Sequence, residues 1–335
     1  MNIPHGEQYF VRCVSFVIAT ILICVLLMAG VCLYILFDYV APARPEDPAT
    51  VFASTAPTSA DADVWIAPDS TLIPETPAGD MIHYGKELIS HTSKYLGPRG
   101  TVQRASNGMN CQNCHLRSGT KPYGNNYSAV VSTYPKFRSR SGSIETIEKR
   151  INDCIERSLN GVPLASDSRE MRAIIAWIEW LGRDVEKGVA PKGSGIMSLP
   201  FLSRAADPSK GRLVYDKHCR LCHGVEGQGF MYPDSVEWKY PPLAGDHSYN
   251  TGAGLFRLSR FAGYVKANMP HGTTWQNPVL TDAEAWDVAA YVNSLPRPEK
   301  HFPGDWPDIS AKPFDHPFGP YADSLSEIQH KYGPF

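Results

Sequence analysis

The sequence predicts an all-α protein in which an N-terminal membrane helix precedes two tandem helical domains built on one plan. An apolar run of 25 residues without a charge extends from Cys13 to Phe37. Further along, apolar residues recur at three- and four-residue steps, which is typical of amphipathic helices. A Cys-x-x-Cys-His pentapeptide occurs twice, each time after one helical segment and before another, which indicates a duplication.

Composition limits the classes of protein that need to be considered. A chain of 335 residues is long enough for about two domains. The net charge of −2 argues against nucleic acid as a partner. Of the eight cysteines, three lie in the apolar N-terminus, four form the two Cys-x-x-Cys pairs, and Cys154 stands alone. This distribution does not indicate an even framework of disulfides.

The apolar run predicts a membrane anchor within residues 1–40. A helix from Cys13 to Phe37 is long enough to cross a bilayer core of about 30 Å. Arg12 precedes the run and Asp38 follows it, which favours a cytoplasmic N-terminus. A cleaved signal peptide is the alternative, but its apolar region normally has only about 7–15 residues. We therefore expect a retained, single-pass anchor.

The rest of the chain divides by composition and periodicity. Residues 41–79 are rich in Pro, Ala, Ser and Thr without apolar periodicity, which predicts an extended tether. Helices are expected at 81–96, 143–161, 168–182, 210–217 and 282–295, with Ser143 and Thr281 as N-caps. The predicted parts are a first domain at 80–185, a linker at 186–204, a second domain at 205–296 and a wrapping tail at 297–335.

The two pentapeptides carry the attachment signature of c-type haem. Two thiols add to the two vinyl groups of the porphyrin, and the next residue places an imidazole under the iron. A four-sulfur zinc site is the alternative, but it leaves the two histidines unexplained, and the cysteine pairs lie 108 residues apart. The sequence therefore predicts two covalently bound haems c in two tandem class I cytochrome c domains. Their attachment residues are Cys111, Cys114 and His115, and Cys219, Cys222 and His223.

Covalent haem attachment of this kind needs the oxidising, extracytoplasmic side of a membrane. This requirement agrees with the orientation of the anchor. We therefore expect a protein of the bacterial inner membrane whose globular part lies in the periplasm.

The second haem has a candidate sixth ligand in Met269. It lies 46 residues beyond His223, in a Pro-containing loop before the last predicted helix. A thioether opposite a histidine raises the reduction potential and suits electron transfer. Met231 is an alternative ligand, and Met269 could instead be an ordinary core residue.

The first haem has no methionine at the equivalent place. Met171 lies inside a predicted helix and Met109 precedes the attachment motif, so Cys154, 39 residues past His115, is the remaining donor. A thiolate opposite a histidine lowers the potential and places a nucleophilic sulfur at the iron. The competing ligands are His83 and His91, and the plain alternative is a small buried cysteine.

The helix around Cys154 also indicates an anion site. Helical spacing places Arg150, Cys154 and Ser158 in one column. A guanidinium is well shaped for sulfonate or carboxylate, so a small sulfur oxyanion is the expected ligand. The local net charge of +3 comes from Lys136, Arg138, Arg140, Lys149 and Arg150 against Glu145 and Glu148.

Over about residues 80–335 the sequence closely resembles the dihaem thiosulfate dehydrogenases, which join two thiosulfates into tetrathionate and release two electrons. The haem motifs and the Cys154 segment are specific to that family. The matching stretches are Asn110-Cys-Gln-Asn-Cys-His-Leu, Gly119-Thr-Lys-Pro-Tyr, Arg150-Ile-Asn-Asp-Cys-Ile-Glu-Arg-Ser-Leu-Asn-Gly, Cys219-Arg-Leu-Cys-His-Gly, Pro241-Pro-Leu, Asn250-Thr-Gly-Ala-Gly, Lys266-Ala-Asn-Met-Pro, Asp305-Trp-Pro-Asp, Gly319-Pro-Tyr-Ala-Asp and Gln329-His-Lys-Tyr-Gly-Pro-Phe.

The resemblance implies a role for each candidate residue. His115 and Cys154 would ligate the first haem, where the chemistry occurs, and His223 and Met269 the second, where electrons leave to a c-type cytochrome or a membrane acceptor. The alternatives are tetrathionate reduction, thiosulfate transfer to a carrier-protein cysteine, and a plain membrane-anchored dihaem electron carrier. The substrate contacts implied are Arg140, Arg150 and Ser158.

Overall fold

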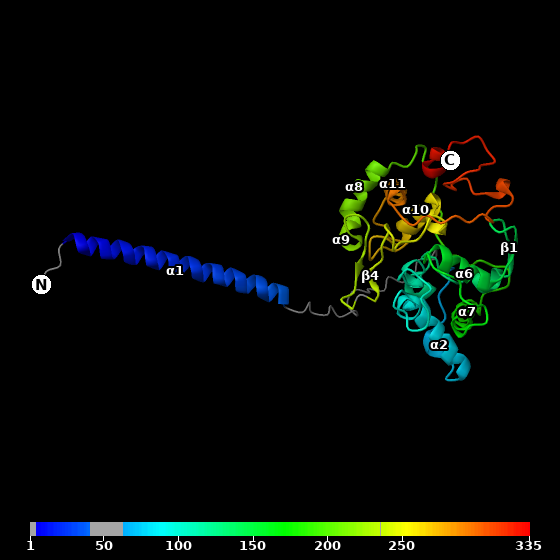
Figure 1. Cartoon of the computed structure of the whole chain (residues 1–335), viewed down its shortest axis with the longest axis horizontal. Coiled ribbons are helices and arrows are strands. Elements are labelled where there is room, and N and C mark those ends of the chain that lie inside the picture. The colour runs from blue at the N-terminus through cyan, green and yellow to red at the C-terminus, as the bar shows by residue number, and fades with distance from the viewer. Residues whose placement is uncertain (1–4, 41–62, 235) are drawn as a thin grey trace. The chain divides into compact units, whose positions relative to one another are not determined.

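The computed structural model describes residues 5–40, 63–234 and 236–335 (Figure 1). Residues 1–60 and 61–335 form two separate units. The first unit contains α1 (His5–Val40), and the second contains all the other elements. Most of the predicted tether, residues 41–62, lies outside the described residues.

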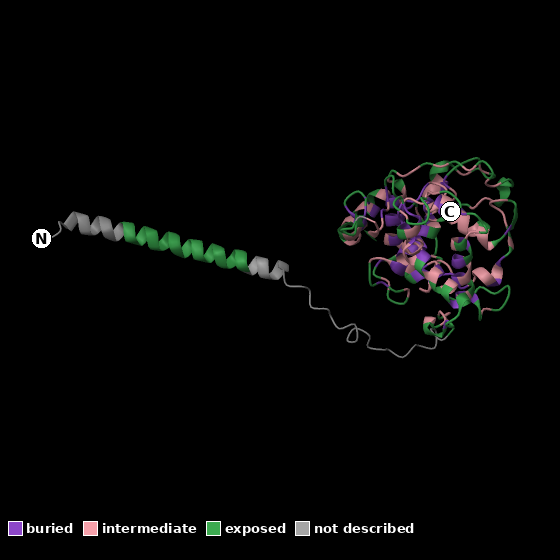
Figure 2. Ribbon diagram, turned by 60° about the horizontal axis from the view of Figure 1, so that its bottom comes forward, coloured by how far each residue is buried: buried purple, intermediate pink, exposed green. Residues whose placement is uncertain are grey.

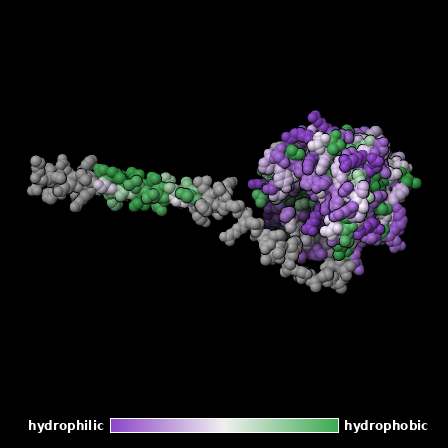
Figure 3. All heavy atoms as spheres, turned by 90° about the horizontal axis from the view of Figure 1, so that it is seen from below, coloured by the Kyte–Doolittle hydropathy of each residue, from purple (hydrophilic) through white to green (hydrophobic). Residues whose placement is uncertain are grey.

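Helix α1 contains the predicted anchor. Its segment Val14–Leu33 has 20 residues, a mean hydropathy of 3.0 and no buried residue. Figure 2 colours this segment as exposed, and Figure 3 shows it as predominantly hydrophobic. Within the described residues it is the one helix long and apolar enough to cross a membrane. A signal sequence near the N-terminus meets the same criteria of length and hydropathy, so α1 is consistent with either role.

The second unit is mostly helical, as its sequence periodicity predicts. Its first half contains η1 (Ser70–Leu72), α2 (Pro77–Ser90), α3 (Thr92–Leu96), η2 (Cys111–Asn113), α4 (Leu116–Gly119), α5 (Val130–Thr133), β1 (Lys136–Arg138), β2 (Ser143–Glu145), α6 (Ile147–Arg157) and α7 (Arg169–Gly182). Its second half contains α8 (Pro208–His218), α9 (Arg220–His223), β3 (Phe230–Met231), β4 (Trp238–Tyr240), η3 (Gly254–Phe256), α10 (Leu258–Asn268), α11 (Asp282–Ser294), η4 (Ile309–Ala311) and α12 (Glu327–Tyr332).

The globular unit begins earlier than the predicted boundary at residue 80. The Trp65 N–H donates to the Lys192 carbonyl at 3.0 Å. Ile73 is 6% exposed and belongs to the first hydrophobic core. Helix α2 then begins at Pro77, three residues before the predicted start of the first domain. This stretch is rich in proline and is therefore part of the predicted tether. Trp65 and Ile73 nevertheless pack on the first core.

Each half is organised around one pair of packed helices. Helix α2 packs on α7 in the first half, and α8 packs on α11 in the second (Figure 1). A glycine lies at each contact: a Cβ on Gly85 would lie 1.9 Å from the Ala173 carbonyl oxygen, and a Cβ on Gly211 would lie 1.9 Å from that of Asp287. The same device for close backbone approach therefore occurs in both halves.

Several local features differ from the sequence predictions. Ser143 does not cap a helix, because residues 143–145 pair with β1 in a two-stranded antiparallel ladder. Helix α6 begins only at Ile147, where the Thr146 hydroxyl caps it by accepting from the Lys149 N–H. Helix α10 was not predicted. At α11 the predicted cap Thr281 is confirmed and forms a capping box with Glu284.

The two halves interlock. The first core takes in Tyr249 and Ala253 from the second half of the chain, and the second core takes in Leu116, the residue after the first haem motif. Figure 2 shows buried residues gathered inside this unit rather than along α1. Elements on either side of the predicted linker therefore share their packing.

The chain after α11 contacts both the segment before α8 and the β1–β2 hairpin. Phe314 and Phe335 pack their rings against Phe201 at centroid distances of 5.1 and 5.8 Å. An earlier part of this tail reaches the β1–β2 hairpin, where Trp306 donates its backbone N–H to the Arg140 carbonyl at 2.6 Å.

The glycine between α8 and α11 provides a test of the helix pairing. We expect Gly211→Ala to lower the free energy of unfolding by about 2 kcal/mol, because the added methyl forces packed helices apart. The measurement is chemical denaturation of the haem-loaded protein followed by circular dichroism. Gly254→Ala is the matched control, since its Cβ would meet nothing within 4 Å. Equal denaturation midpoints for the two variants would contradict the close approach.

Candidate functional site: the first haem motif and its arginines

The first attachment motif begins at η2, and side chains from both halves of the chain fix the segment before it. The Cys111 N–H donates to the Thr92 hydroxyl at 2.9 Å, and the Asn110 N–H donates to the Asn113 side-chain oxygen at 2.7 Å. The Asn110 side chain accepts from the Ser93 N–H at 2.8 Å. These bonds set the direction in which the chain enters the motif.

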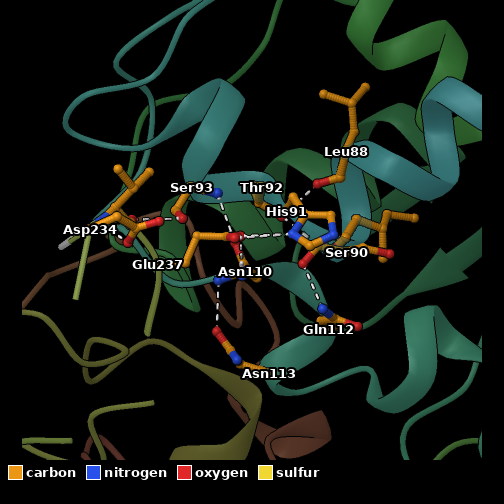
Figure 4. A network of polar contacts seen from close by, with 12 residues as sticks. Leu88, Ser90, His91, Thr92, Ser93, Asn110, Gln112, Asn113, Asp234 and Glu237 are labelled. Carbon is orange, nitrogen blue, oxygen red and sulfur yellow. Dashed lines mark hydrogen bonds and ion pairs between the residues drawn. The ribbon is translucent and has the colours of Figure 1, made fainter. Parts of the chain in front are cut away.

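Figure 4 shows the polar network that holds this segment to the second half of the chain. The carboxylate of Glu237, the residue before β4, lies 3.0 Å from His91 Nδ1 and accepts from the Asn110 side chain at 3.0 Å. The Ser93 hydroxyl donates to the Val236 carbonyl at 3.0 Å. His91, one of the competing haem ligands in the sequence analysis, is thus part of a structural clamp.

Both motif histidines are oriented in the same way. His115 Nδ1 lies 2.5 Å from the Asn125 carbonyl oxygen, and His223 Nδ1 lies 2.9 Å from that of Pro241. A carbonyl can only accept, so Nδ1 carries the proton and the lone pair of each ring is on Nε2. Burial lowers the pKa of His115 to about 4 and also lowers the pKa of His223, so both rings are neutral at neutral pH.

Three of the four motif cysteines, each partly buried, have a raised pKa. Burial raises the pKa of Cys111 to about 11 and the pKa of Cys114 to about 12. Burial likewise raises the pKa of Cys219 to about 12. The cysteines in the described part of the chain form no disulfide. They also do not gather with histidines or carboxylates into a metal-binding cluster, so the four-sulfur zinc alternative has no support within residues 63–234 and 236–335.

Cys154 lies beside the first motif. Its thiolate form would add to the effect of burial in raising the pKa of both Cys111 and Cys114. Of the other donors considered for the first haem, Met109 and Met171 are buried in the first core and His83 is exposed. Met231, the alternative to Met269 at the second haem, is exposed on β3. The structure therefore brings the lone cysteine of the sequence to the first pair.

Arg150 is electrostatically coupled to Cys154. The Cys154 thiolate is the largest of the influences that raise the pKa of Arg150, and the Arg150 charge in turn helps to lower the pKa of His115. Ser158 is the C-cap of α6 and donates its N–H to the Cys154 carbonyl at 2.8 Å. The predicted column of Arg150, Cys154 and Ser158 is therefore in place on α6.

Arg140 comes from the turn between β1 and β2. Burial, together with repulsion from Arg157 and Arg150, lowers the pKa of Arg140 to about 10. Two other predicted cations are paired, because Lys149 bonds to Asp153 and Arg138 lies 3.8 Å from Glu145. A dianion would relieve the repulsion among the guanidinium groups that remain.

The tail supplies two residues that the sequence reasoning did not place at the site. The Asp305 carboxylate accepts two hydrogen bonds from Arg157, at 2.7 and 2.8 Å. The next residue, Trp306, holds the Arg140 carbonyl and lies under its guanidinium, with 5.6 Å from Cζ to the ring centroid. The Asp305-Trp-Pro-Asp stretch was the available signal, but nothing in its local pattern says which arginines it meets.

The comparisons with known proteins identify the family of the chain. Residues 101–186 match the family described as "SoxA/TsdA, cytochrome c domain", and residues 208–296 match "Cytochrome c". The chain is 37% identical over 247 residues to the thiosulfate dehydrogenase of Psychrobacter arcticus, covering 73% of this chain and 72% of the relative. It is 36% identical over 260 residues to that of Allochromatium vinosum, covering 76% and 88%. The chain belongs to the thiosulfate dehydrogenase family.

A solved structure supports the fold of this family member. The structure titled thiosulfate dehydrogenase (TsdBA) from Marichromatium purpuratum in its "as isolated" form superposes with a TM-score of 0.65 at 32% identity. The match covers 71% of this chain and 50% of the other, so the chain spans about half the length of that protein. The predicted fold of two cytochrome c domains and the predicted membership of this enzyme family are confirmed.

Two cytochrome c domains bind two covalently attached haems c, as the sequence predicts. The residues present fit this cofactor. Each motif offers two thiols, and each motif histidine has its Nδ1 occupied by a carbonyl, which leaves Nε2 for iron. Met269, at the C-cap of α10, packs against the second core, as Cys219 does. The roles of Met269 and Cys154 as sixth ligands stay predictions.

The ion pair between Arg157 and Asp305 makes a prediction about stability. The two side chains are 7% and 20% exposed, so Asp305→Ala would leave a buried guanidinium unpaired. We expect the free energy of unfolding to fall by about 3 kcal/mol. Asp184→Ala is the control, because its pair with Arg183 is 76% exposed on the carboxylate side and contributes at most about 1 kcal/mol. Equal losses in chemical denaturation would show that the tail contact is not a buried ion pair.

Proposed function

We propose that the protein oxidises two thiosulfates to tetrathionate beside the first haem motif. The observation that carries this proposal is the placement of Arg150 and Cys154 one turn apart on α6, beside the first motif. The Arg150 charge helps to lower the pKa of His115, and Cys154 helps to raise the pKa of Cys111 and Cys114. A nucleophilic sulfur and a buried guanidinium in one place suit a substrate that has a sulfane sulfur at one end and a sulfonate at the other. The relatives named thiosulfate dehydrogenase support the same substrate.

The chain's residues have separate tasks in this proposal. Arg140, Arg150 and Ser158 bind the sulfonate oxygens and orient the sulfane sulfur towards the Cys154 sulfur. The Cys154 thiolate and the first thiosulfate form a sulfur–sulfur bond with loss of two electrons, which gives a cysteinyl S-thiosulfonate. The second thiosulfate attacks the sulfane sulfur of this adduct, so tetrathionate forms and the Cys154 thiolate is released. No proton is consumed or produced.

The two haems c supply the one-electron acceptors for this oxidation, with His115 and Cys154 as ligands of the first and His223 and Met269 as ligands of the second. We propose that the electrons leave from the second half of the chain to a c-type cytochrome or a membrane acceptor. Met269 lies in a loop that bonds to the first half, since the Asn268 side chain donates to the Tyr123 carbonyl at 3.0 Å. This contact supports a short separation between the two redox sites.

We further propose that α1 is retained as a single-pass anchor in a bacterial inner membrane. The globular unit would then lie in the periplasm, where haem is attached and thiosulfate is available. The 20-residue apolar segment and its lack of buried side chains support this placement.

Anaerobic mixing tests the function directly. Thiosulfate should reduce the haems within turnover time and produce tetrathionate, read from haem absorbance and product analysis with both potentials measured on the same sample. Haem oxidation by tetrathionate without the forward reaction would replace the proposal with a tetrathionate reductase. Conjugation of thiosulfate to a carrier-protein cysteine, without tetrathionate, would indicate a transferase. No response to either anion would leave a dihaem electron carrier.

The role of Cys154 yields a sharper prediction. We expect Cys154→Gly to abolish turnover while both haems stay covalently attached, because the attachment thiols are elsewhere. Cys154→Ala should give the same result at a smaller cost to the helix, since alanine is the better helix former by about 1 kcal/mol. Steady-state tetrathionate formation and haem staining after denaturing electrophoresis are the measurements. Full activity in the alanine variant would remove Cys154 from the mechanism.

A further inference from the structure

We infer that the Tyr134 hydroxyl is a further substrate-binding group, which donates a hydrogen bond to a sulfonate oxygen of thiosulfate held beside Arg150 and Cys154. This inference rests on the proposed function and adds a residue that the sequence analysis did not consider. It is carried by the burial of the hydroxyl, by its lack of a partner and by the charges around it.

The Tyr134 hydroxyl is buried and unpaired. The side chain is 5% exposed, and no hydrogen-bond partner for its oxygen exists among the residues that the structure describes. Leaving such a group unpaired costs about 1–3 kcal/mol, so buried hydroxyls in native proteins normally have a partner. A partner that is not part of the polypeptide is therefore expected at this oxygen.

The ring of Tyr134 is held in a fixed position between α5 and β1. Its N–H donates to the Val130 carbonyl at 2.9 Å, and its own carbonyl accepts from the Lys187 ammonium at 2.6 Å. The Lys136 ammonium lies 4.9 Å from the centre of the ring. A cation over the face of a phenol withdraws electron density from it and strengthens the O–H as a donor. The backbone of Tyr134 is thus held at both its N–H and its carbonyl, and Lys136 lies over its ring.

The charged groups around the hydroxyl are those of the candidate site. Burial raises the pKa of Tyr134 despite the opposing influence of Arg150 and Arg138, so the phenol keeps its proton at neutral pH. Glu145 and Cys154 act on it in the same sense as burial, and Tyr134 in turn contributes to the raised pKa of Arg150. Printed contacts aside from these effects connect the same groups: Lys136, whose ammonium lies over the ring, faces Glu145 in the β1–β2 ladder, and the Arg150 N–H donates to the carbonyl of the next residue, Thr146, at 3.1 Å. The phenol, the guanidinium and, one turn further along α6, the cysteine therefore belong to one region.

The chemistry of this region favours a sulfonate over a carboxylate of the chain. Glu145 is the carboxylate that contributes to the raised pKa of Tyr134. It makes no hydrogen bond to the Tyr134 hydroxyl and instead lies 3.8 Å from Arg138. A sulfonate has three acceptor oxygens, enough to bind a guanidinium and a phenol at once. Binding that end of thiosulfate leaves its sulfane sulfur for Cys154. A haem propionate or a water molecule is the competing partner.

The test compares two tyrosine-to-phenylalanine variants of the haem-loaded protein. We expect Tyr134→Phe to raise the KM for thiosulfate about tenfold or more, as for a hydrogen bond to a charged group, with kcat changed less than twofold. The resting absorbance of both haems should stay the same. Tyr291→Phe is the matched control: its side chain is 6% exposed and has Arg212 over the ring at 5.5 Å, but it belongs to the second core. The control should keep the wild-type KM.

Thermal unfolding separates this role from a structural one. Without anion, Tyr134→Phe should melt at the wild-type temperature or above it, because the substitution removes an unpaired buried hydroxyl. Thiosulfate should then raise the melting temperature of the wild type more than that of the variant. A lower melting temperature without anion, together with equal shifts on adding thiosulfate, would show that the hydroxyl supports the fold only.

The remaining outcomes also decide the matter. An unchanged KM in an active Tyr134→Phe variant overturns the inference and leaves the proposed function standing. A changed resting spectrum of the first haem with an unchanged KM assigns the hydroxyl to a propionate and overturns it as well. If the wild type turns over neither anion, the proposed function fails; the inference then depends on equilibrium binding of thiosulfate, and equal affinities of wild type and variant overturn it.

Discussion

The structure depends above all on the burial of positive charge around helix α6. Arg150 and Arg157 are both close enough to repel Arg140, and the fold offsets each of the three charges in a different way. Arg157 has the Asp305 carboxylate, and Arg150 has the sulfur of Cys154. Arg140 lies over the face of Trp306 and is attracted by Asp305, which is already paired with Arg157, so its charge is the least compensated of the three. A bound dianion would compensate the positive charge of Arg140 that the polypeptide leaves without a carboxylate of its own.

This arrangement requires both halves of the chain. The segment that carries the first haem motif is bonded to the second half at several points, including the Tyr264 hydroxyl to the Asn113 carbonyl at 3.1 Å and the Lys121 ammonium to the Thr273 carbonyl at 3.1 Å. Glu237 adds the clamp on Asn110. If the second half were only tethered to the first, these hydrogen bonds to the segment of the first haem motif could not form. Duplication has here produced one interlocked unit in which the second copy helps to build the site of the first.

The sequence predicted what is local and missed what depends on distant contacts. The motif spacing was sufficient to predict two haems, and helical spacing placed Arg150, Cys154 and Ser158 on one face, because both patterns lie within a few residues. The hairpin that presents Arg140 was missed, since strands of three residues leave no clear period. The partners of Arg140 and Arg157 were missed because Trp306 and Asp305 lie some 150 residues away in an irregular tail. Tyr134 gave no signal, since only its three-dimensional surroundings leave its hydroxyl unpaired.

The two copies of one motif differ in their surroundings, and this difference agrees with a division of labour. In the first copy, residues 111–115 are all at least partly covered, and buried arginines lie nearby. In the second, Arg220 is exposed and Leu221 is 91% exposed, and the adjoining turn of α8 carries Lys217 and His218. An enclosed cationic site strengthens the binding of a small anion, because charge interactions increase as water is excluded. An open site suits electron exchange with another protein, which needs contact rather than enclosure. The proposed order of events, with sulfur chemistry at the first motif and electron exit at the second, follows from that asymmetry.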